Sequence, residues 1–341
     1  MTKLRLVFFD GDESSADVCQ GETLLAAAKR SGIKLASDCE MGDCQTCRAR
    51  IVAGDVTHDP DTILSLSDDE VASGEVLLCV ATAHADVTVQ LPYERASLLP
   101  ARNVSLQVQA IEQLCDSVVR LTARVAERIT LTFLPGQYLN LRVPGTDQWR
   151  SYSMANAPNE TGALEFLVRI LDQGAMSEFL TRRAAPGDMI DSQGPFGRFY
   201  LRKSEATQPM LMIAGGTGLA PMAAMLRMMK TRGDRRSIVL CFGVTRKQDM
   251  FYLEEIQALC GGLPGLDVRT AVMIGNAAQH ASGTAVDLVR PADVVDRDIY
   301  LCGPPAMTDH ARKAVDRHGA TSARIFAERF MLAGDNKPYA L

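Results

Sequence analysis

Four of the nine cysteines stand at a spacing that suits metal chemistry. Cys39, Cys44 and Cys47 are separated by four and two residues, and Cys79 follows 32 positions later. Two iron ions need four thiolates, and a tight loop with one distant cysteine can wrap such a pair while leaving one edge near the surface. Gly42 lets the backbone approach the inorganic sulfides. The pattern therefore predicts a [2Fe–2S] cluster.

A structural zinc site is the competing interpretation of the same thiols. Zinc ribbons favour two CxxC pairs, and this chain has one such pair. Disulfides are not expected, because the number of cysteines is odd and the N-terminus lacks the hydrophobic core of a signal peptide. Four further cysteines are expected to be small buried apolar side chains: Cys19, Cys115, Cys241 and Cys260.

The first 98 residues resemble a plant-type ferredoxin domain. The segment from Asp38 to Arg48, DCEMGDCQTCR, is similar to the cluster loop of that family. Glu40 differs from the family, which usually has a basic residue there, and this change bears on the reduction potential and the docking charge. The resemblance implies a β-grasp fold with a cluster held by the four cysteines.

A second segment, Trp149 to Ser153, resembles the flavin-binding RxYS motif of the ferredoxin–NADP reductase superfamily. The guanidinium of Arg150 can pair with a flavin pyrophosphate. The ring of Tyr152 can stack on the isoalloxazine, and the hydroxyl of Ser153 can bond near the nitrogen that accepts hydride. Ser151 completes the motif.

Further flavin contacts are expected downstream. The resemblance implies a second phosphate contact from Gly174 through Met176 to Ser177, at the head of a predicted helix where backbone N–H groups favour anions. Val168 and Arg169 are candidates to border the flavin, and a surface charge is an equally good interpretation of Arg169.

A glycine-rich loop predicts the nicotinamide site. Gly215, Gly216, Thr217 and Gly218 stand between a buried strand and a helix, where the backbone can approach a pyrophosphate. The loop resembles the GGTGxAP loop of the same superfamily. The CGP motif of that superfamily is matched by three further residues: Cys302, Gly303 and Pro304. We expect Tyr152, Ser153, Thr217 and Cys302 at the reacting centre.

The choice of nucleotide and the C-terminal aromatic depend on single residues. Arg246, after the second predicted strand, could meet a 2′-phosphate or be a solvated charge, and Asp249 lies just beyond it. The family resemblance favours NADH. Phe330 is a candidate to lie against the flavin, with a core position as the alternative. The histidines form no ligand spacing and are expected at the surface or satisfied, away from the motifs: His58, His84, His280, His310 and His318.

The elements that must position these residues divide the chain into three predicted domains, 1–98, 99–205 and 206–341. A proline-bounded stretch from 92 to 100 predicts a linker. Short strands between Gly/Pro turns predict a small antiparallel barrel: Val104–Ala110, Tyr138–Val143, Leu164–Ile170 and Phe199–Leu201. From Pro209, strands alternate with helices, which predicts a doubly wound parallel sheet. The fold class is thus multidomain α+β and α/β.

Charge and composition exclude several classes of protein. Residues 1–98 carry 17 acidic and 8 basic side chains, whereas the remainder carries 24 and 28. An acidic first domain argues against nucleic-acid binding and suits a basic protein surface. No apolar run approaches the length of a membrane span. We therefore expect a cytoplasmic protein that does not bind a membrane.

The order of the three parts resembles the reductase components of two-component ring-hydroxylating dioxygenases, especially the benzoate and anthranilate type. This resemblance implies electron transfer from NADH through FAD and the [2Fe–2S] cluster to a partner oxygenase with a Rieske cluster and mononuclear iron. A nicotinamide gives two electrons and a cluster carries one, so the flavin is the required converter. The alternatives are the reductase of a diiron monooxygenase and a non-enzymatic zinc-binding protein. A monomer is expected.

Overall fold

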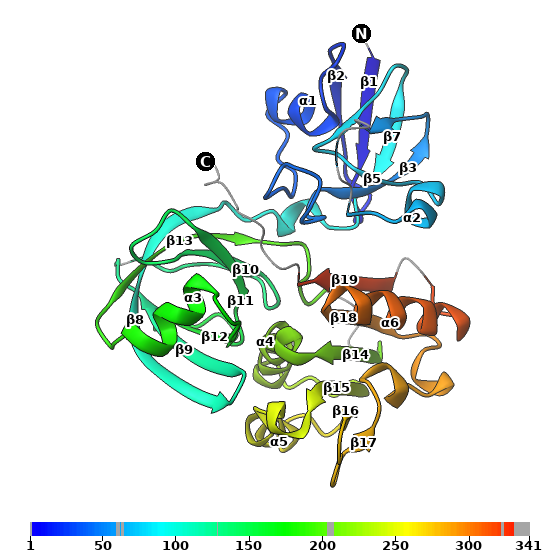
Figure 1. Cartoon of the computed structure of the whole chain (residues 1–341). Coiled ribbons are helices and arrows are strands. Elements are labelled where there is room, and N and C mark those ends of the chain that lie inside the picture. Colours follow the sequence, from blue (N-terminus) through cyan, green and yellow to red (C-terminus); the bar gives the residue numbers. More distant parts are fainter. Residues whose placement is uncertain are drawn as a thin grey trace. The chain divides into compact units, whose positions relative to one another are not determined.

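The computed structural model describes residues 2–58, 62, 65–127, 129–202, 208–321 and 324–330. The chain separates into two compact units. The first ends at Pro100 and also takes in Phe196–Arg198, and the second begins at Ala101. Each unit is described by itself below, with the element labels of Figure 1.

The first unit is a five-stranded mixed sheet, of order β2-β1-β7-β3-β5, accompanied by helix α1. Leu4 and Leu6 alternate with exposed residues and are fully buried, which is why this segment forms a strand with one core face. Thr23 caps the helix by accepting a hydrogen bond from the N–H of Ala26. Its elements are β1 (Thr2–Val7), β2 (Glu13–Val18), α1 (Leu24–Arg30), β3 (Arg48–Ala53), β4 (Thr57–His58), α2 (Asp68–Ala72), β5 (Glu75–Leu77), β6 (Ala81–Thr82) and β7 (Val87–Gln90).

The predicted linker after β7 is only partly a linker. Tyr93 is 1% exposed, its ring meets Phe8 edge to face, and its hydroxyl accepts a hydrogen bond from the N–H of Ala36. Residues Arg95–Ser97 form a short 3₁₀ turn. The start of the segment therefore belongs to the core of the first unit, because its aromatic ring outweighs the proline signal.

The second unit begins with a six-stranded sheet of order β11-β10-β13-β8-β9-β12. An antiparallel bridge between Met154 and Phe166 links the end of β11 to β12, so the sheet curls back toward its own edge, as the predicted barrel requires. Its elements are β8 (Arg102–Cys115), β9 (Val118–Val125), β10 (Tyr138–Arg142), β11 (Trp149–Ser153), β12 (Ala163–Arg169), α3 (Ala175–Glu178) and β13 (Met189–Phe196).

One predicted strand of this sheet, Phe199–Leu201, is wrong. These residues are buried but join no sheet, and the N–H of Leu201 donates to the carbonyl of Pro135 instead. Phe199 packs in the core that contains helix α4 (Leu219–Thr231). A short apolar run signals burial, and here burial comes without strand pairing.

The second unit continues as a parallel sheet of order β17-β16-β15-β14-β18-β19 (Figure 1). Alternate residues of β14 enter different cores: Met210, Met212 and Ala214 pack with α4 and α5, whereas Leu211 and Ile213 pack with α6. Helices therefore cover both faces, as predicted. The elements are β14 (Met210–Gly215), α4 (Leu219–Thr231), β15 (Ile238–Arg246), α5 (Leu253–Cys260), β16 (Leu266–Ile274), β17 (Ala281–Ser282), β18 (Asp298–Gly303), α6 (Pro305–Arg317) and β19 (Ile325–Arg329).

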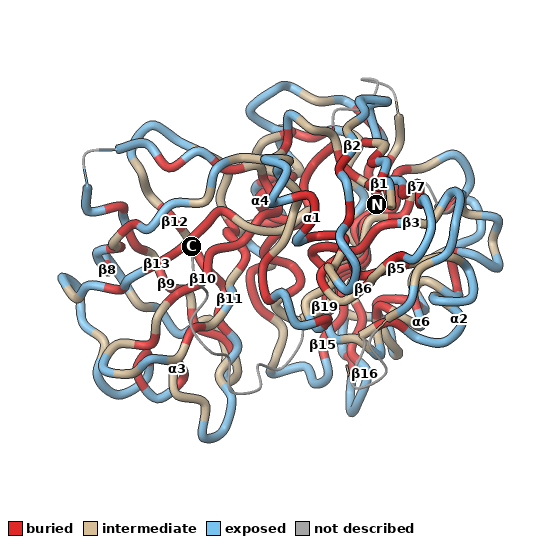
Figure 2. Tube along the Cα trace, turned by 90° about the horizontal axis from the view of Figure 1, so that it is seen from above, coloured by how far each residue is buried: buried red, intermediate tan, exposed pale blue. Residues whose placement is uncertain are grey.

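The strand order reverses between β14 and β18. After β14 the chain adds β15, β16 and β17 on one side, then returns to place β18 and β19 on the other. A crevice outside the carboxyl ends of the strands is the expected ligand site at such a reversal. Figure 2 shows buried residues in red and exposed residues in pale blue, and both kinds occur along the strands, because many strands have only one face in a core. Within the described residues, no helix combines the length and apolar character needed to cross a bilayer.

Candidate functional site

The cysteine loop in the first unit is wound so that backbone N–H groups face sulfur. Glu40, Gly42 and Gln45 have φ of 56°, 85° and 56°, all in the left-handed region. The N–H groups of Met41 and Cys44 donate to the Sγ of Cys39 at 3.4 and 3.3 Å. Successive inward N–H groups create a concave site that favours negative charge. Such a loop suits thiolates and sulfides.

The four thiols gather as two pairs. Cys39 contacts Cys44, and Cys47 contacts Cys79. Hydrogen bonding from the Cys44 thiol, with help from backbone N–H groups, lowers the pKa of Cys39 to about 6. Hydrogen bonding from Cys79 likewise lowers the pKa of Cys47. Each pair thus contains one thiol that ionises readily.

A paired arrangement distinguishes two irons from one zinc ion. A structural zinc ion takes four donors around one point. A [2Fe–2S] cluster needs two thiolates on each iron, which matches the two pairs. Cys79 lies in the turn that follows β5. The four cysteines therefore fit the cluster.

A buried arginine, Arg48, fixes the position of this loop through hydrogen bonds. The guanidinium of Arg48, directly after Cys47, donates to Glu70 at 2.7 Å, to Glu75 at 2.8 Å and to the side chain of Gln45 at 3.1 Å. Glu70 belongs to the capping box of α2, and Glu75 begins β5. The loop is thereby tied to the strand that leads to Cys79.

The expectation for the other cysteines is only partly met. Cys241 is buried, but Cys115 and Cys260 are half-buried and Cys19 is exposed. Cys19 lies just past β2, where the chain turns toward α1, and a turn leaves little apolar surface to cover it.

The predicted flavin segment forms β11 at the edge of the barrel sheet. The Ser151 hydroxyl donates to Asn140 at 2.6 Å, and Arg150 donates to the side chain of Gln148 at 2.7 Å. Ser153 is buried and Tyr152 is half-buried. Burial raises the pKa of Tyr152, so its phenol stays neutral near pH 7.

The turn from Gly174 to Ser177, which is the second predicted flavin contact, is tightly packed. Gly174 caps α3, and a Cβ there would lie 2.9 Å from the Ser177 Oγ and 3.2 Å from the Leu171 carbonyl. The Ser177 hydroxyl accepts from the N–H of Leu171 at 2.9 Å. Met176 and Val168 are in the barrel core, so their backbones rather than their side chains are available to a ligand.

The glycine loop sits at the carboxyl end of β14, against the end of β18. A Cβ on Gly218 would lie 2.2 Å from the carbonyl oxygen of Cys302, and one on Gly215 would lie 2.5 Å from the Met307 sulfur. Gly303 has φ of 153°, and a Cβ there would lie 2.9 Å from Met307. The two motifs found in the sequence therefore meet, and only glycine permits this approach.

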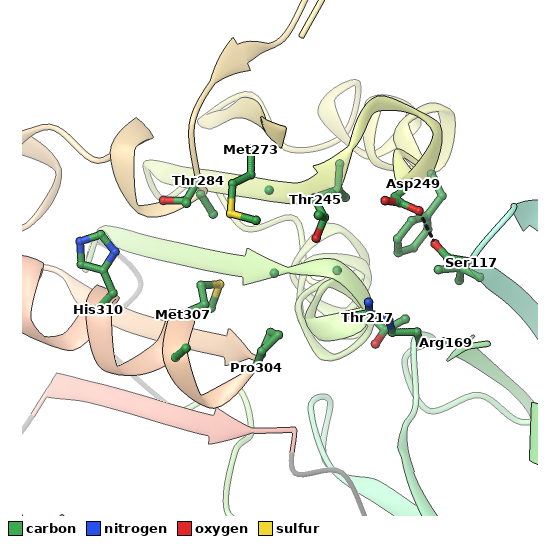
Figure 3. Close-up of a pocket in the computed structure, with 18 residues that line it drawn as sticks. Ser117, Arg169, Thr217, Thr245, Asp249, Met273, Thr284, Pro304, Met307 and His310 are labelled. Atoms are coloured by element: carbon green, nitrogen blue, oxygen red, sulfur yellow. Dashed lines mark hydrogen bonds between the residues drawn. The ribbon is translucent and has the colours of Figure 1, made fainter. Parts of the chain in front are cut away.

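A cleft of about 330 Å³ opens at this point (Figure 3). Arg169 comes to it from the barrel, Thr217 from the glycine loop and Pro304 from the start of α6. It is lined by Ser117, Val118, Arg169, Gly215, Gly216, Thr217, Gly243, Val244, Thr245, Asp249, Phe251, Met273, Thr284, Ala285, Pro304, Ala306, Met307 and His310. Barrel residues and sheet residues thus share one cavity at the predicted switch point.

Cys302 lies behind this cleft rather than in its wall. Its side chain is fully buried in the core that also contains α4. Burial, followed by the negative charge of Glu328, raises the pKa of Cys302 well above its ordinary value. The group is therefore a neutral thiol.

Asp249 and His310 line the cleft, although neither belongs to a sequence motif. Asp249 accepts a hydrogen bond from the Ser117 hydroxyl at 2.8 Å, which joins sheet and barrel (Figure 3). His310 is exposed, as expected of the histidines, but it lines the cleft three residues after Met307 and therefore does not lie away from the predicted nucleotide site. The spacing of His310 from Met307, on one face of α6, is the signal that could have found it.

Phe330 follows β19 and its N–H donates to the carbonyl of Gly303 at 2.9 Å. The ring is half-buried and packs against the core of α4 and α5. Phe330 therefore contacts the CGP motif through its backbone, and the residues after it are outside the described part.

Comparisons with known proteins assign three segments of the chain to domain families. Residues 7–84 match the 2Fe-2S iron-sulfur cluster binding domain, residues 105–200 the oxidoreductase FAD-binding domain, and residues 212–313 the oxidoreductase NAD-binding domain. The toluate 1,2-dioxygenase electron transfer component of Pseudomonas putida is 34% identical over 333 residues, which cover 96% of this chain and 98% of the relative. The chain belongs to the oxygenase electron transfer components. It is an oxidoreductase with FAD, NADH and a [2Fe–2S] cluster, and it serves a terminal oxygenase.

Other relatives of this electron transfer component serve different oxygenases by name. The reductase component of propane 2-monooxygenase from Rhodococcus jostii (strain RHA1) is 32% identical over 334 residues, 94% of this chain and 90% of the relative. Among solved structures, the Amycolatopsis cytochrome P450 reductase GcoB has a TM-score of 0.72 and 29% identity, and covers 96% of this chain and 98% of its own. The architecture is thus shared across oxygenase types. The matches to two oxidoreductase domains and a 2Fe-2S domain replace the alternative of a non-enzymatic zinc protein.

Proposed function

We propose that the partner is a ring-hydroxylating dioxygenase with a Rieske cluster and mononuclear iron, and that this chain supplies its electrons from NADH. The toluate dioxygenase relative, which aligns over nearly the whole of both chains, supports this choice. The observation that carries the electron path is the pairing of the four cysteines as Cys39 with Cys44 and Cys47 with Cys79. A paired set of thiols serves a one-electron cluster.

Each predicted cluster residue has a distinct task in this proposal. Cys39 and Cys44 would hold one iron, where the N–H groups of Met41 and Cys44 would offset the negative charge. Cys47 and Cys79 would hold the other. Arg48 keeps the loop and the Cys79 turn in register through its two carboxylate partners.

The flavin and nicotinamide residues are assigned by the same argument. Arg150 and the Gly174–Ser177 turn hold the diphosphate, while Tyr152 and Ser153 face the ring system. The glycine loop from Gly215 to Gly218 receives the pyrophosphate of NADH at the start of α4. Bound FAD accepts a two-electron hydride and releases electrons one at a time.

Thr217 and Cys302 act at the nicotinamide end of the cleft. Thr217 lines the cleft and can hydrogen-bond the bound nucleotide. Cys302 supports the glycine loop from behind through its backbone carbonyl, which lies against Gly218. Because the thiol is buried and neutral, its part is steric, with no proton transfer.

A preference for NADH over NADPH follows from which side chain reaches the cleft. Asp249, beyond the second strand of the sheet, lines it. Arg246 is exposed and is not among the lining residues. A carboxylate near the ribose favours the 2′-hydroxyl and repels a 2′-phosphate.

A diiron monooxygenase is the second candidate partner, and the propane 2-monooxygenase relative favours it. Its identity and coverage differ little from those of the toluate relative.

We also propose domain boundaries at residues 98 and 205 and a monomeric protein. Limited proteolysis would test the boundaries, and sedimentation would test the monomeric state.

The test is reconstitution with both kinds of oxygenase. The chain reduced by NADH is mixed anaerobically with a purified Rieske-type dioxygenase or with a diiron hydroxylase, and reduction of each acceptor is followed by electron paramagnetic resonance. We expect faster reduction of the Rieske centre. Preferential reduction of the diiron centre would transfer the assignment to the second candidate.

A further inference from the structure

Three segments far apart in the sequence meet at a polar cluster inside the second unit. Glu165 lies on β12 and Arg227 on α4, and Tyr252 is the N-cap residue of α5 (Figure 1). The Tyr252 hydroxyl donates to Glu165, and Arg227 donates to the Tyr252 hydroxyl at 2.6 Å. Arg227 also donates to Glu165 at 3.1 Å. These three residues are called the Tyr252 network below.

The network touches both halves of the redox site. Arg227 donates to the carbonyl of Ala155 at 3.1 Å, two residues after Ser153 of the flavin segment. Its helix, α4, begins directly after Gly218. Phe251, next to Tyr252, lines the nucleotide cleft. One set of side chains thus connects the flavin strand, the glycine loop and the cleft wall.

Tyr252 is held in an unusual backbone conformation. Its φ of 64° and ψ of 16° are in the left-handed region, which bulky residues seldom adopt. Its side chain is 4% exposed. Burial raises the pKa of Tyr252, so the phenol remains a donor at neutral pH. Such a conformation persists only where the surroundings fix it, and it is found preferentially at functional sites.

Another ion pair joins the same two layers at a similar exposure to solvent, since the Arg227 and Glu165 side chains are 26% and 17% exposed. Arg120 on β9 donates to Glu255 on α5 at 2.6 Å, and the side chains are 20% and 27% exposed. Neither residue bonds to the backbone just after the flavin segment, as Arg227 does at Ala155. Because the Arg120 pair joins the same layers at a similar exposure but lacks that bond, it provides a matched comparison.

We propose that Tyr252, Glu165 and Arg227 are positioning residues that fix the nicotinamide cleft relative to the flavin strand for hydride transfer. The inference rests on the transfer from NADH to FAD described above. Hydride transfer requires the reacting atoms to be within about 3.5 Å of each other and aligned, so a small displacement of one layer slows the step strongly. Binding of either cofactor alone is much less sensitive to that displacement.

The experiment uses the holoenzyme and two mild variants. Tyr252→Phe keeps the ring and removes the hydroxyl that joins Glu165 to Arg227. Arg227→Lys keeps the charge but cannot reach Ala155, Glu165 and Tyr252 together. Glu255→Gln is the matched control, because it breaks the neighbouring Arg120 pair. Flavin reduction by NADH is followed anaerobically in a stopped-flow instrument, with the charge-transfer absorbance of the complex as the geometric readout.

We expect the limiting rate of flavin reduction to fall about tenfold in Tyr252→Phe and further in Arg227→Lys. The charge-transfer absorbance should weaken, while FAD content, the flavin potential and the Kd for NADH change less than about twofold. Glu255→Gln should match the unaltered chain. Unchanged rates and absorbance in both variants, with full FAD content, would overturn the positioning role. Failure of the unaltered chain to reduce its flavin would instead overturn the proposed function.

Discussion

At the residue scale, the cluster ligands are the most directly testable assignment. Cys79→Ser should lose the electron paramagnetic resonance signal of the reduced cluster and most of the bound iron, because one iron is left with a single cysteine. Reduction of the flavin by NADH should persist, since that site is in the other unit. Iron content and the resonance signal provide the measurement.

Cys19→Ser is the matched control for that variant, because Cys19 is exposed and lies outside the loop. It should bind iron as the unaltered chain does. A Cys79→Ser protein with a full iron content and an unaltered signal would remove Cys79 from the ligand set.

The pH dependence of hydride transfer follows from two groups whose pKa values are raised, Cys302 and Tyr152. Burial raises the pKa of both Cys302 and Tyr152. A raised pKa keeps an acid neutral until the pH exceeds it, so neither group should titrate between about pH 6 and 9. The limiting rate of flavin reduction should therefore be flat across that range. A fall near pH 8 that disappears in Cys302→Ala would show that the thiol ionises.

The nucleotide preference also depends on one residue. Asp249→Asn keeps an acceptor for the Ser117 hydroxyl and removes the negative charge. We expect the ratio of kcat/KM for NADPH to that for NADH to rise about tenfold, because a close like charge is removed. Asp147→Asn, at a highly exposed side chain, should leave the ratio unchanged. An unchanged ratio in Asp249→Asn would show that a residue other than Asp249 sets the preference for NADH over NADPH.

At the element scale, the contact between the glycine loop and β18 leaves no room for a side chain. Gly218→Ala would put a Cβ 2.2 Å from the Cys302 carbonyl, so the loop must move. Overpacking of this kind costs about 1–3 kcal/mol. Calorimetric titration with NADH should show weaker binding, and thermal unfolding should show lower stability.

Gly261→Ala is the comparison, because a Cβ there would meet nothing closer than 3.9 Å and the backbone has no positive φ. This variant should bind NADH normally. If both alanine variants behave alike, the close approach at Gly218 has no part in nucleotide binding.

Elements were predictable where a local pattern and tertiary packing agree. The buried run of β14 and the glycines after it define strand, loop and helix from sequence alone, and the structure confirms them. Phe199–Leu201 fails because apolar content signals burial and not hydrogen-bond pairing. The predicted linker is only partly a linker, because the buried ring of Tyr93 packs the start of this proline-bounded segment into the core of the first unit.

Contacts between distant segments were beyond sequence reasoning. Glu165 and Tyr252 are 87 residues apart, and neither belongs to a motif. His310 was missed for a related reason, since its position in the cleft depends on how α6 packs beside β18. The motifs locate the cofactors, whereas packing between layers decides which other side chains reach them.

At the scale of the whole molecule, two compact units divide the electron path. The cluster loop is in the first, and the flavin strand and nucleotide cleft are together in the second. The single second unit explains why hydride transfer can use one shared cleft. It also predicts that cluster variants and hydride-transfer variants act independently.

The central claim is that NADH reduces a flavin and that its electrons then reach a [2Fe–2S] cluster in the same chain. The most direct measurement is an anaerobic titration with NADH, in which flavin absorbance and the cluster's electron paramagnetic resonance signal are followed together with iron and FAD content. The account predicts one flavin and two irons per chain, bleaching of the flavin, and a reduced-cluster signal that Cys79→Ser abolishes. A bleached flavin beside an iron-containing but silent cluster, or no bleaching by either nucleotide, would contradict it.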